Sequence, residues 1–393
     1  MKILFLTSRL PYPPYRGDKS RTYNFIKALS QNHEIHLISF CETKEDYSYK
    51  KELKKYCKEI HLIYLPEWLS WFKAVFFYFS KAPSQVAYYR SFRMKNLINK
   101  IAKNENYDMV YVHLFRMYQY SQYIPASVYR VTDLTDVVSK ELFRSIGLDY
   151  GWRVRLVKRE AHKIRNYERK VLKQSQEVWV ISDQEKKDLI NNSDCNNVFV
   201  VGIGVEKKDS VRAPEKNSIL FFGYSHTGHN KAALDFLRNK IMPEIIKKIP
   251  DAKLSVFGAG KWTERKKRKN EFPINNFGFV ADPGEVFSSN AVMVAPILHS
   301  AGTQTKILEA MNYGLPVVTS SFGNEGIQAK NGSQIVICDE PSSYVEQIVM
   351  ILTDSEIGEK VGREGQKYVR DKFSWHTVID RVGEIEKLLK HKK

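Results

Sequence analysis

Lys306 and Glu309 stand three positions apart in a stretch whose pattern suits nucleotide binding. Residues three apart on a helix share one face, so a cation and a carboxylate would lie side by side there. An ammonium can pair with a diphosphate, and a carboxylate one turn deeper can accept hydrogen bonds from both hydroxyls of a ribose. An amphipathic helix with an ordinary surface Lys–Glu pair has the same spacing, so the spacing alone leaves both interpretations open.

The residues around this pair predict the elements that would position it. Short apolar runs and helical periodicity indicate a strand, a turn-rich loop, a helix and a second strand, over 291–295, 296–303, 304–313 and from 316 onward. The loop delivers Gly302, Thr303 and Gln304 to the start of the helix. Free backbone N–H groups and the helix dipole favour a phosphate at that position.

The pattern GTxxKxxEAMxxGxPVV, over 302–318, resembles the C-terminal signature of the group 1 glycosyltransferases, retaining enzymes of the GT-B fold (glycosyltransferase family 4). The resemblance implies an α/β protein with two Rossmann-like, doubly wound domains facing a central cleft. It also implies a nucleotide-sugar substrate, and it assigns donor binding to Gly223, Gly302, Thr303, Gln304, Lys306 and Glu309.

Length and composition agree with two domains. A chain of 393 residues is too long for one ordinary core. We expect an N-terminal acceptor-side domain over 1–205, a linker over 206–217 and a donor-binding domain over 218–373, with a helix at about 374–393 packing back on the first domain. The four cysteines are widely spaced, which favours a reducing cytoplasmic location over a disulfide framework.

The first loop, PYPPYRGDKSRTYN, resembles the opening loop of the family. The resemblance places Arg16, Gly17, Asp18 and Arg21 on the acceptor side or near a phosphate. Asp18 stands where a second glycine is common, and Asp does not tolerate the backbone angles that Gly does. The alternative for the basic residues is a solvated loop.

Two polar residues are expected at the carboxyl ends of strands, where α/β folds place ligand groups. His113 ends the strand predicted at 108–112, and the resemblance gives it contact with the transferring sugar. Asp133 follows the strand predicted at 129–132, and there it could orient an acceptor hydroxyl. For Asp136 we expect an N-cap of the next helix.

Lys231 is the candidate for the lysine that grips the diphosphate in related enzymes, after the turn glycine Gly223. The arginine of the family is absent, because Tyr224 occupies its place, and Ala301 replaces a second glutamate. The resemblance implies a catalyst that needs neither a metal nor a cofactor, with Lys306, His113, Asp133 and Lys231 as the catalytic set.

The segment 68–89 concentrates aromatic residues, and basic residues follow it as far as Lys100. Such a segment suits an anionic membrane surface, and the alternative is a helix pair whose aromatics are core. The basic excess of 62 − 44 = 18 charges would attract any polyanion. No groove-reading or base-stacking motif accompanies the basic helix expected over 151–173, so we expect no nucleic-acid partner.

The sequence therefore predicts a retaining glycosyltransferase that moves a sugar from a nucleotide-diphosphate sugar to a lipid-linked or polysaccharide acceptor. We expect it in the cytoplasm, with the inner face of the cytoplasmic membrane as a peripheral site. Two alternatives share the fold: a nucleotide-sugar epimerase and a non-catalytic, membrane-docked scaffold.

Overall fold

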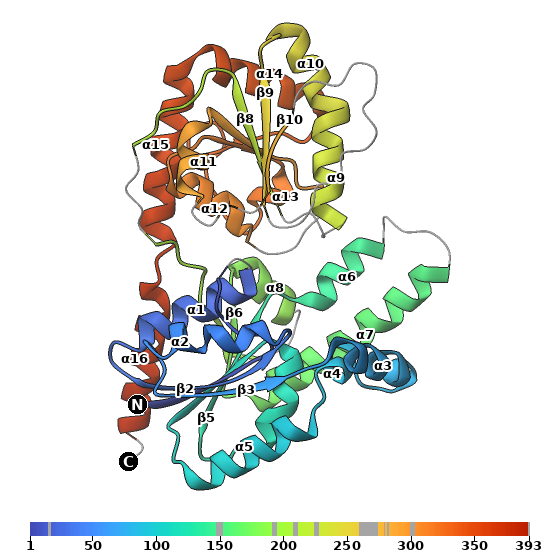
Figure 1. Ribbon diagram of the computed structural model, residues 1–393, viewed down its shortest axis with the longest axis vertical. Helices are drawn as coiled ribbons and strands as arrows, with labels where there is room; N and C mark the ends of the chain where they lie inside the picture. Colours follow the sequence, from blue (N-terminus) through green and yellow to red (C-terminus); the bar gives the residue numbers. More distant parts are fainter. Residues whose placement is uncertain are drawn as a thin grey trace. The chain divides into compact units, whose positions relative to one another are not determined.

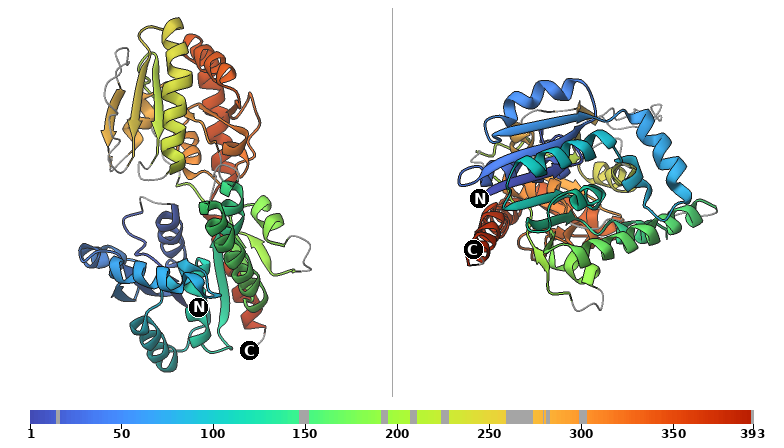
Figure 2. Two further views of the ribbon diagram at one scale, coloured as in Figure 1. Left: turned by 90° about the vertical axis from the view of Figure 1, so that its right-hand side faces the viewer. Right: turned by 90° about the horizontal axis from the view of Figure 1, so that it is seen from below.

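The computed structural model describes residues 1–14, 17–146, 152–190, 195–206, 211–223, 228–258, 274–278, 280, 283–298 and 303–391 (Figure 1). The chain divides into two compact units. Unit 1 is Met1–Gly204 with Trp375–Lys393, and unit 2 is Val205–Ser374. Each unit is an α/β body built on one sheet, and helices cover both faces of each sheet (Figures 1 and 2).

Unit 1 contains a seven-stranded parallel sheet in the order β3-β2-β1-β4-β5-β6-β7. Its strands are β1 (Lys2–Thr7), β2 (Glu34–Cys41), β3 (Glu59–Tyr64), β4 (Met109–His113), β5 (Tyr129–Thr135), β6 (Glu177–Val180) and β7 (Val198–Val200). Its helices are α1 (Gly17–Leu29), η1 (Glu45–Tyr49), α2 (Lys50–Leu53), α3 (Glu67–Phe76), η2 (Phe77–Phe79), α4 (Ser84–Tyr88), α5 (Phe92–Asn104), η3 (Phe115–Tyr123), α6 (Val138–Ile146), α7 (Trp152–Gln174), α8 (Asp183–Ile190) and α16 (His376–Lys390).

Alternation along the central strands builds two cores in unit 1. Leu4 and Leu6 of β1 face a cluster with α5, η3 and α7, whereas Ile3 and Phe5 face a cluster with α1 and α16. Successive side chains of a strand point to opposite faces, so a strand covered by helices on both sides is apolar throughout.

The last helix, α16, belongs to unit 1 although it follows the whole of unit 2 in sequence. Val378, Val382 and Ile385 are fully buried in the second of these cores. Arg381 donates from Nε to Glu177 at 2.9 Å, and its guanidinium lies 3.4 Å from the ring centroid of Phe199. The helix therefore completes unit 1.

Unit 2 contains a six-stranded parallel sheet in the order β10-β9-β8-β11-β12-β13. Its strands are β8 (Ser218–Phe222), β9 (Lys253–Phe257), β10 (Ile274–Gly278), β11 (Val292–Ala295), β12 (Val317–Thr319) and β13 (Val336–Ile337). Its helices are α9 (Gly228–Phe236), η4 (Leu237–Ile241), α10 (Met242–Lys248), α11 (Gly284–Ser289), α12 (Thr305–Asn312), α13 (Ser321–Asn324), α14 (Pro341–Thr353) and α15 (Ser355–Lys372).

The stretch 206–217, which we expected as a linker, is packed on unit 2 where the structure describes it. Arg212 donates to the carbonyls of Gly314 at 3.0 Å and Asn290 at 2.6 Å, and the amide of Ala213 donates to Ser288. Residues 207–210 lie outside the described part. The strand expected at 198–205 stops at Val200, and the carbonyls of Val201 and Gly202 accept from a side chain instead.

Candidate functional site

Helix α12 of unit 2 begins at the edge where the parallel strands end. Its start at Thr305 and its end at Asn312 agree with the predicted helix. Gln304 is the N-cap residue, and no side chain caps the helix there. The first amides of a helix have no partner within it, so this end offers backbone N–H groups and the positive end of the dipole to an anion.

Lys306 lies in the first turn of α12 and carries the charge of the site. Its Nζ donates to Oδ1 of Asn230 at 2.8 Å and lies 5.8 Å from the ring centroid of Phe221. No carboxylate of the described residues lies within ion-pairing distance of it. Burial without a charged partner lowers the pKa of this ammonium to about 8. A phosphate would supply the negative charge that Lys306 lacks.

Asn230 positions Lys306, and sequence reasoning missed it. The residue is buried in α9, and its amide reaches the lysine past Gly223. A Cβ on Gly223 would lie 2.9 Å from Cγ of Asn230, so the glycine makes room for the amide. The neighbouring Gly258, at φ +136°, leaves no space for a Cβ against the Gly223 carbonyl. The turn glycine predicted for donor binding thus lies beside the lysine's partner.

Lys231, the lysine predicted to grip the diphosphate, is exposed on α9. Neighbouring positions on a helix point about 100° apart, so the structure directs Asn230 and not Lys231 toward Lys306. Lys231 is therefore not part of the cluster around Lys306 that the structure shows, and its contact with a diphosphate stays a prediction. The signal missed in the sequence was Asn230, a polar residue directly before Lys231 on the same helix, whose side chain is buried while that of Lys231 is exposed.

The remaining donor-side residues lie along α12 and the segment before it. Thr303 is buried, and its hydroxyl donates to the Gly326 carbonyl at 3.2 Å, which ties the start of the helix to the segment after α13. Glu309 is partly exposed one turn beyond Lys306, as the spacing predicted. Gly302 lies outside the described residues. Binding of a donor by these residues stays a prediction.

In unit 1 the predicted polar residues form a closed cluster. Arg21 donates from Nε to Oδ2 of Asp133 at 2.6 Å, and Tyr111 donates its hydroxyl to the same oxygen. The other carboxylate oxygen, Oδ1, accepts from the amide of Thr135 at 2.9 Å. The two terminal nitrogens of the Arg21 guanidinium donate to the carbonyls of Val201 and Gly202, at 2.8 and 2.9 Å.

This cluster corrects two predictions. Asp133 is fully buried and Arg21 is 1% exposed, so neither reaches an acceptor hydroxyl or a phosphate. A buried charge must be paired and hydrogen-bonded, and each of these residues supplies what the other needs. The pair fastens α1 and the segment after β7 to β5. Thr135, at φ 65°, marks the distortion of β5 beside it.

His113 ends β4 as predicted and is 3% exposed. Its Nε2 is buried with no hydrogen-bond partner in the described chain, and its ring stacks on Tyr111 at 6.3 Å. Burial lowers the pKa of the imidazole to about 4, so the ring is neutral near pH 7. A neutral ring with an unpaired nitrogen can donate to or accept from a hydroxyl, and its contact with a sugar stays a prediction.

Other predicted residues of unit 1 lie at the start of α1 and α6. Gly17 and Asp18 open α1, and Asp18 accepts from Arg9 at 2.7 Å, which joins the helix to the loop after β1. Arg16 lies outside the described residues. The amides at the start of α6 are taken by Glu185 and Glu168, so these carboxylates occupy the place where we expected Asp136 as a cap.

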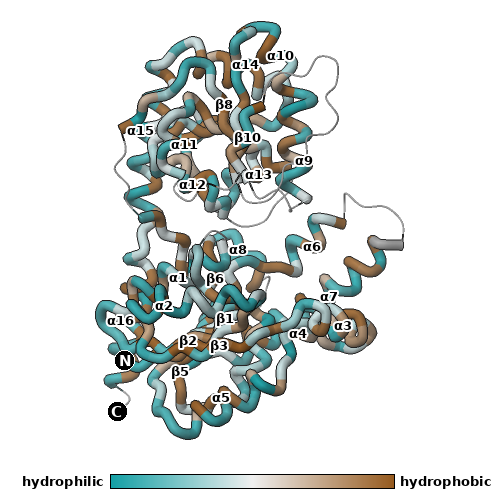
Figure 3. Tube along the Cα trace, viewed as in Figure 1, coloured by the Kyte–Doolittle hydropathy of each residue, from teal (hydrophilic) through white to brown (hydrophobic). Residues whose placement is uncertain are grey.

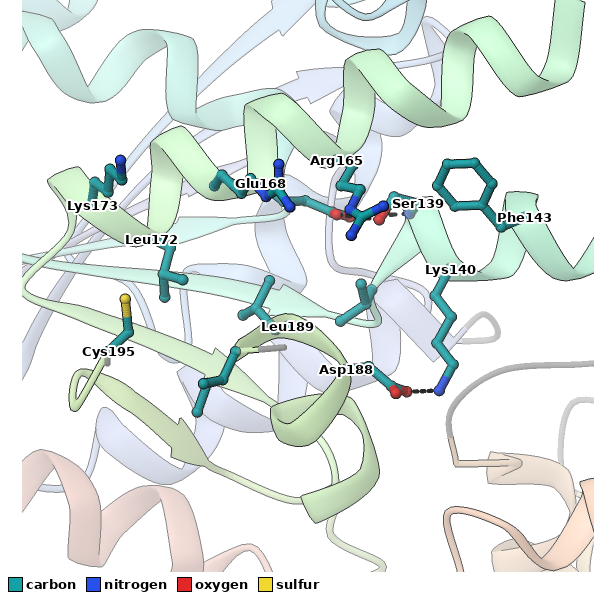
Figure 4. Close-up of a pocket in the computed structure, with 13 residues that line it drawn as sticks. Ser139, Lys140, Phe143, Arg165, Glu168, Leu172, Lys173, Asp188, Leu189 and Cys195 are labelled. Carbon is teal, nitrogen blue, oxygen red and sulfur yellow. Dashed lines mark hydrogen bonds and ion pairs between the residues drawn. The ribbon is translucent and has the colours of Figure 1, made fainter. Parts of the chain in front are cut away.

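A separate hollow of about 590 Å³ opens between α6, α7 and α8 (Figure 4). Four cations line it, and Lys140 among them pairs with Asp188; the others are Arg165, Arg169 and Lys173. None of the predicted site residues lines this hollow. Burial raises the pKa of Glu168 at its floor to about 7, although Ser139 donates to that carboxylate from both its amide and its hydroxyl.

Among the described residues, no group of three or more His, Cys, Asp or Glu side chains is arranged to hold a metal ion. In the same part of the chain, no helix combines the length and the apolar character needed to cross a membrane. Of the cysteines, Cys41, Cys57 and Cys338 are buried, Cys195 is partly exposed, and all four are free.

Comparison with known proteins agrees with the sequence resemblance. Residues 216–354 match the family model of glycosyl transferases group 1. A 44.6 kDa uncharacterized protein of the cps region of Klebsiella pneumoniae is 24% identical in an alignment of 371 positions that covers 88% of this chain and 90% of that protein. Spore coat protein SA of Bacillus subtilis is 27% identical over 36% of this chain and 42% of its own length.

Solved structures share the fold over nearly the whole chain. Sucrose-phosphate synthase from Thermosynechococcus elongatus superposes with a TM-score of 0.70 at 15% identity and full coverage of both chains. TarM gives 0.71 at 10% identity, with 98% of each chain covered. Anabaena HepE in complex with UDP-glucose gives 0.67 at 14% identity, covering 98% of this chain and 99% of HepE. The predicted α/β architecture of two Rossmann-like, GT-B-type units is confirmed.

Proposed function

Because residues 216–354 belong to the glycosyl transferases group 1 family, we propose that this protein is a retaining glycosyltransferase. It takes a sugar from a nucleoside diphosphate sugar and adds it to a lipid-linked or polysaccharide acceptor in the cytoplasm. One observation carries the proposal: the ammonium of Lys306, without a carboxylate partner in the described chain, stands at the uncapped start of α12. That pairing of a cation with free amides suits a diphosphate.

The chemistry follows from charge that grows on the leaving group. The bond between the anomeric carbon and the phosphate oxygen breaks, and negative charge develops on the departing diphosphate. Preorganised donors near that oxygen lower the barrier, and Lys306 with the α12 amides would supply them without a metal ion. The acceptor oxygen bonds to the anomeric carbon on the face that the diphosphate leaves, and its proton passes to the leaving phosphate.

Glu309 would bind the nucleotide rather than react. It follows Lys306 by three positions on α12, so its carboxylate would accept from the ribose hydroxyls while the lysine holds the diphosphate. The neighbours suggest a first nucleotide to test, since HepE is described in complex with UDP-glucose and TarM with UDP. The cps-region relative favours a surface polysaccharide as the product.

The test is thermal stabilisation by UDP, GDP and ADP and by their sugars, on the wild type and on Glu309→Ala. At a ligand concentration of 100 dissociation constants, binding adds about 2.7 kcal/mol to the free energy of unfolding. We expect one nucleotide to stabilise the wild type and to stabilise the variant less. The effect should persist in EDTA if the protein supplies the positive charge.

Product analysis then separates the activities that share the fold. The protein is incubated with the nucleotide sugar that stabilises it. Nucleotide release that requires an added glycan acceptor supports transfer. A product that keeps the anomeric configuration of the donor sugar supports a retaining mechanism. Conversion of the nucleotide sugar to its epimer without an acceptor would instead indicate an epimerase. A folded protein that no nucleotide stabilises would favour a non-catalytic scaffold and contradict the proposal.

A further inference from the structure

Helix α3 turns its large aromatic side chains toward solvent. Its residues Trp68, Trp71, Phe72, Val75 and Phe76, with Phe79 of η2, recur at steps of three and four, and each is between 59% and 77% exposed. We call these six side chains the aromatic stripe. The opposite, buried side of α3 holds the small residues Ser70 and Ala74. An ordinary surface helix has the reverse arrangement, with its apolar face inward.

The rest of unit 1 holds the stripe in this orientation. Lys73 donates to the Arg90 carbonyl at 2.6 Å, on the segment after α4. At η2, Tyr78 donates its hydroxyl to the Leu156 carbonyl of α7 at 3.2 Å. Arg159 of the same helix donates to the Phe79 carbonyl at 3.2 Å. The segment is therefore held to unit 1 at the middle of the stripe and at its C-terminal end. Figure 3 shows α3 among the hydrophobic segments at the surface of unit 1.

Cations surround the stripe. Between 67 and 104 the chain carries Glu67 as its single acidic residue, against seven basic ones: Lys73, Lys81, Arg90, Arg93, Lys95, Lys100 and Lys103. The Arg90 guanidinium lies 5.4 Å from the ring centroid of Phe77, and Arg159 lies 5.4 Å from that of Phe79. An apolar surface edged with cations is complementary to a layer whose headgroups are negative and whose interior is apolar.

A second hollow of unit 1 adjoins this edge. It has about 650 Å³, and Phe77, Arg90 and Phe92 line it. Further cations of its lining are Lys95, Arg130 and Lys170, and no acidic residue of the described chain lines it. The Nε of Arg130 is buried without a hydrogen-bond partner in the described chain. A basic hollow with a buried, unused donor is suited to a phosphate group.

We propose that the aromatic stripe lies in the interface of a bilayer with anionic headgroups, and that the adjoining basic hollow receives a lipid phosphate. Trp and Phe rings are stable at the depth of the headgroups, and contiguous exposed apolar surface of this kind marks a contact site. A second copy of the chain is disfavoured as the occupant. Two copies of the cationic edge would be brought together, and each chain carries a net charge of +18.

Vesicle flotation tests the proposal. The full chain is mixed with vesicles of phosphatidylglycerol and phosphatidylcholine in equal parts, or of phosphatidylcholine alone. We expect the wild type to float with the anionic vesicles, and to do so less as salt screens the attraction. The variant Trp71→Ser/Phe76→Ser should bind at least tenfold more weakly. Leu388→Ser is the matched control, because Leu388 is an exposed apolar residue on α16, and it should bind like the wild type.

Two further measurements assign the parts of the surface. Arg90→Gln/Arg93→Gln should weaken binding to anionic vesicles several-fold and leave a smaller dependence on salt. Brominated lipids should quench the tryptophan fluorescence of the wild type on vesicles, and Trp68→Phe/Trp71→Phe should remove most of that quenching. All of these side chains are exposed, so each variant should keep the melting temperature of the wild type.

Three outcomes would overturn the proposal. The first is a wild type that does not float with anionic vesicles. The second is a stripe variant that floats as the wild type does, since another surface would then bind. The third is a wild type that sediments as a dimer, becomes monomeric through Trp71→Ser/Phe76→Ser and never binds vesicles, which would assign the stripe to a second copy.

Discussion

The charged cluster of unit 1 and the charged cluster of unit 2 differ in what they leave unpaired. In unit 1, Arg21 and Asp133 satisfy each other and bind the nearby backbone, so no part of the pair faces solvent. In unit 2, Lys306 has one neutral partner, Asn230, and burial lowers its pKa. The first arrangement stabilises a fold, and we propose that the second holds a charge for a ligand.

The comparison gives a rule for interpreting polar residues at strand ends. Position at the carboxyl end of a parallel strand brings a side chain to the edge where ligands bind, but it does not make that side chain available. Availability depends on whether neighbours supply all the hydrogen bonds that the group can make. Four predictions test this distinction, and we take them from the largest effect to the smallest.

Breaking the unit 1 pair should have the largest effect. Arg21→Met leaves the carboxylate of Asp133 buried without its counter-charge, so the free energy of unfolding of unit 1 should fall by about 3–5 kcal/mol. Urea unfolding measures it. The control Arg363→Met breaks an exposed pair with Glu359 and should leave the stability unchanged. Equal effects of the two substitutions would show that the buried pair is not structural.

Removing the unit 2 cation should affect ligand binding and not stability. Lys306→Met takes away one charge-assisted contact of about 1.5–3 kcal/mol, so the dissociation constant for UDP should rise roughly 10- to 150-fold. Isothermal titration calorimetry measures it, and the melting temperature without ligand should not fall. Unchanged affinity would contradict the assignment of Lys306 to the diphosphate, and a fall in melting temperature would make the two clusters alike.

The lowered pKa of Lys306 predicts how binding depends on pH. If the protonated lysine binds the diphosphate as proposed, the UDP dissociation constant should be steady from pH 6 to about 8 and should rise above it, by at most tenfold per pH unit. Without nucleotide, raising the pH has the opposite effect. Lys306 binds its proton more tightly in the unfolded chain than in the folded one, so the free energy of unfolding should rise with pH above 8. Lys306→Met should lose both trends. An identical pH profile in this variant would assign them to another group.

The smallest effect should come from the residue that positions the lysine. Asn230→Ala removes one hydrogen bond of about 1 kcal/mol, which is about a fivefold loss of UDP affinity. Gly223→Ala should lower the affinity for UDP further than Asn230→Ala does, because the new methyl group would collide with the Asn230 side chain. The double variant Gly223→Ala/Asn230→Ala should bind UDP better than Gly223→Ala alone. A double variant no better than Gly223→Ala would show that the glycine is needed for another contact.

Sequence periodicity predicted most of the local structure. Helix α12, the long helix α7 and the central strands lie within a few residues of their predicted bounds, because two apolar faces or one apolar stripe specify them. The sequence pattern did not predict the short helices of 67–88 individually. Their aromatic residues permitted either a core or a surface, and the choice depended on the small inward residues Ser70 and Ala74.

Side-chain partners could not be predicted, because they are distant in the chain. Arg21 and Asp133 are 112 positions apart, and Asn230 and Lys306 are 76 apart. A spacing rule reaches one or two helical turns, so it related Lys306 to Glu309 and missed Asn230. The same limit made Asp133 look like a ligand group when Arg21, in the first helix, had already neutralised it.

The placement of α16 has a consequence for how the molecule is made. A ribosome delivers the polypeptide from its N-terminus, so all of Val205–Ser374 emerges before the helix that fills the unit 1 core. During that interval the core that contains Phe25 and Trp179 lacks the side chains of Val378 and Val382, which belong to it in the finished protein. Unit 2, being continuous in sequence, can acquire its structure first, whereas unit 1 must wait for α16, which is synthesised after the whole of unit 2.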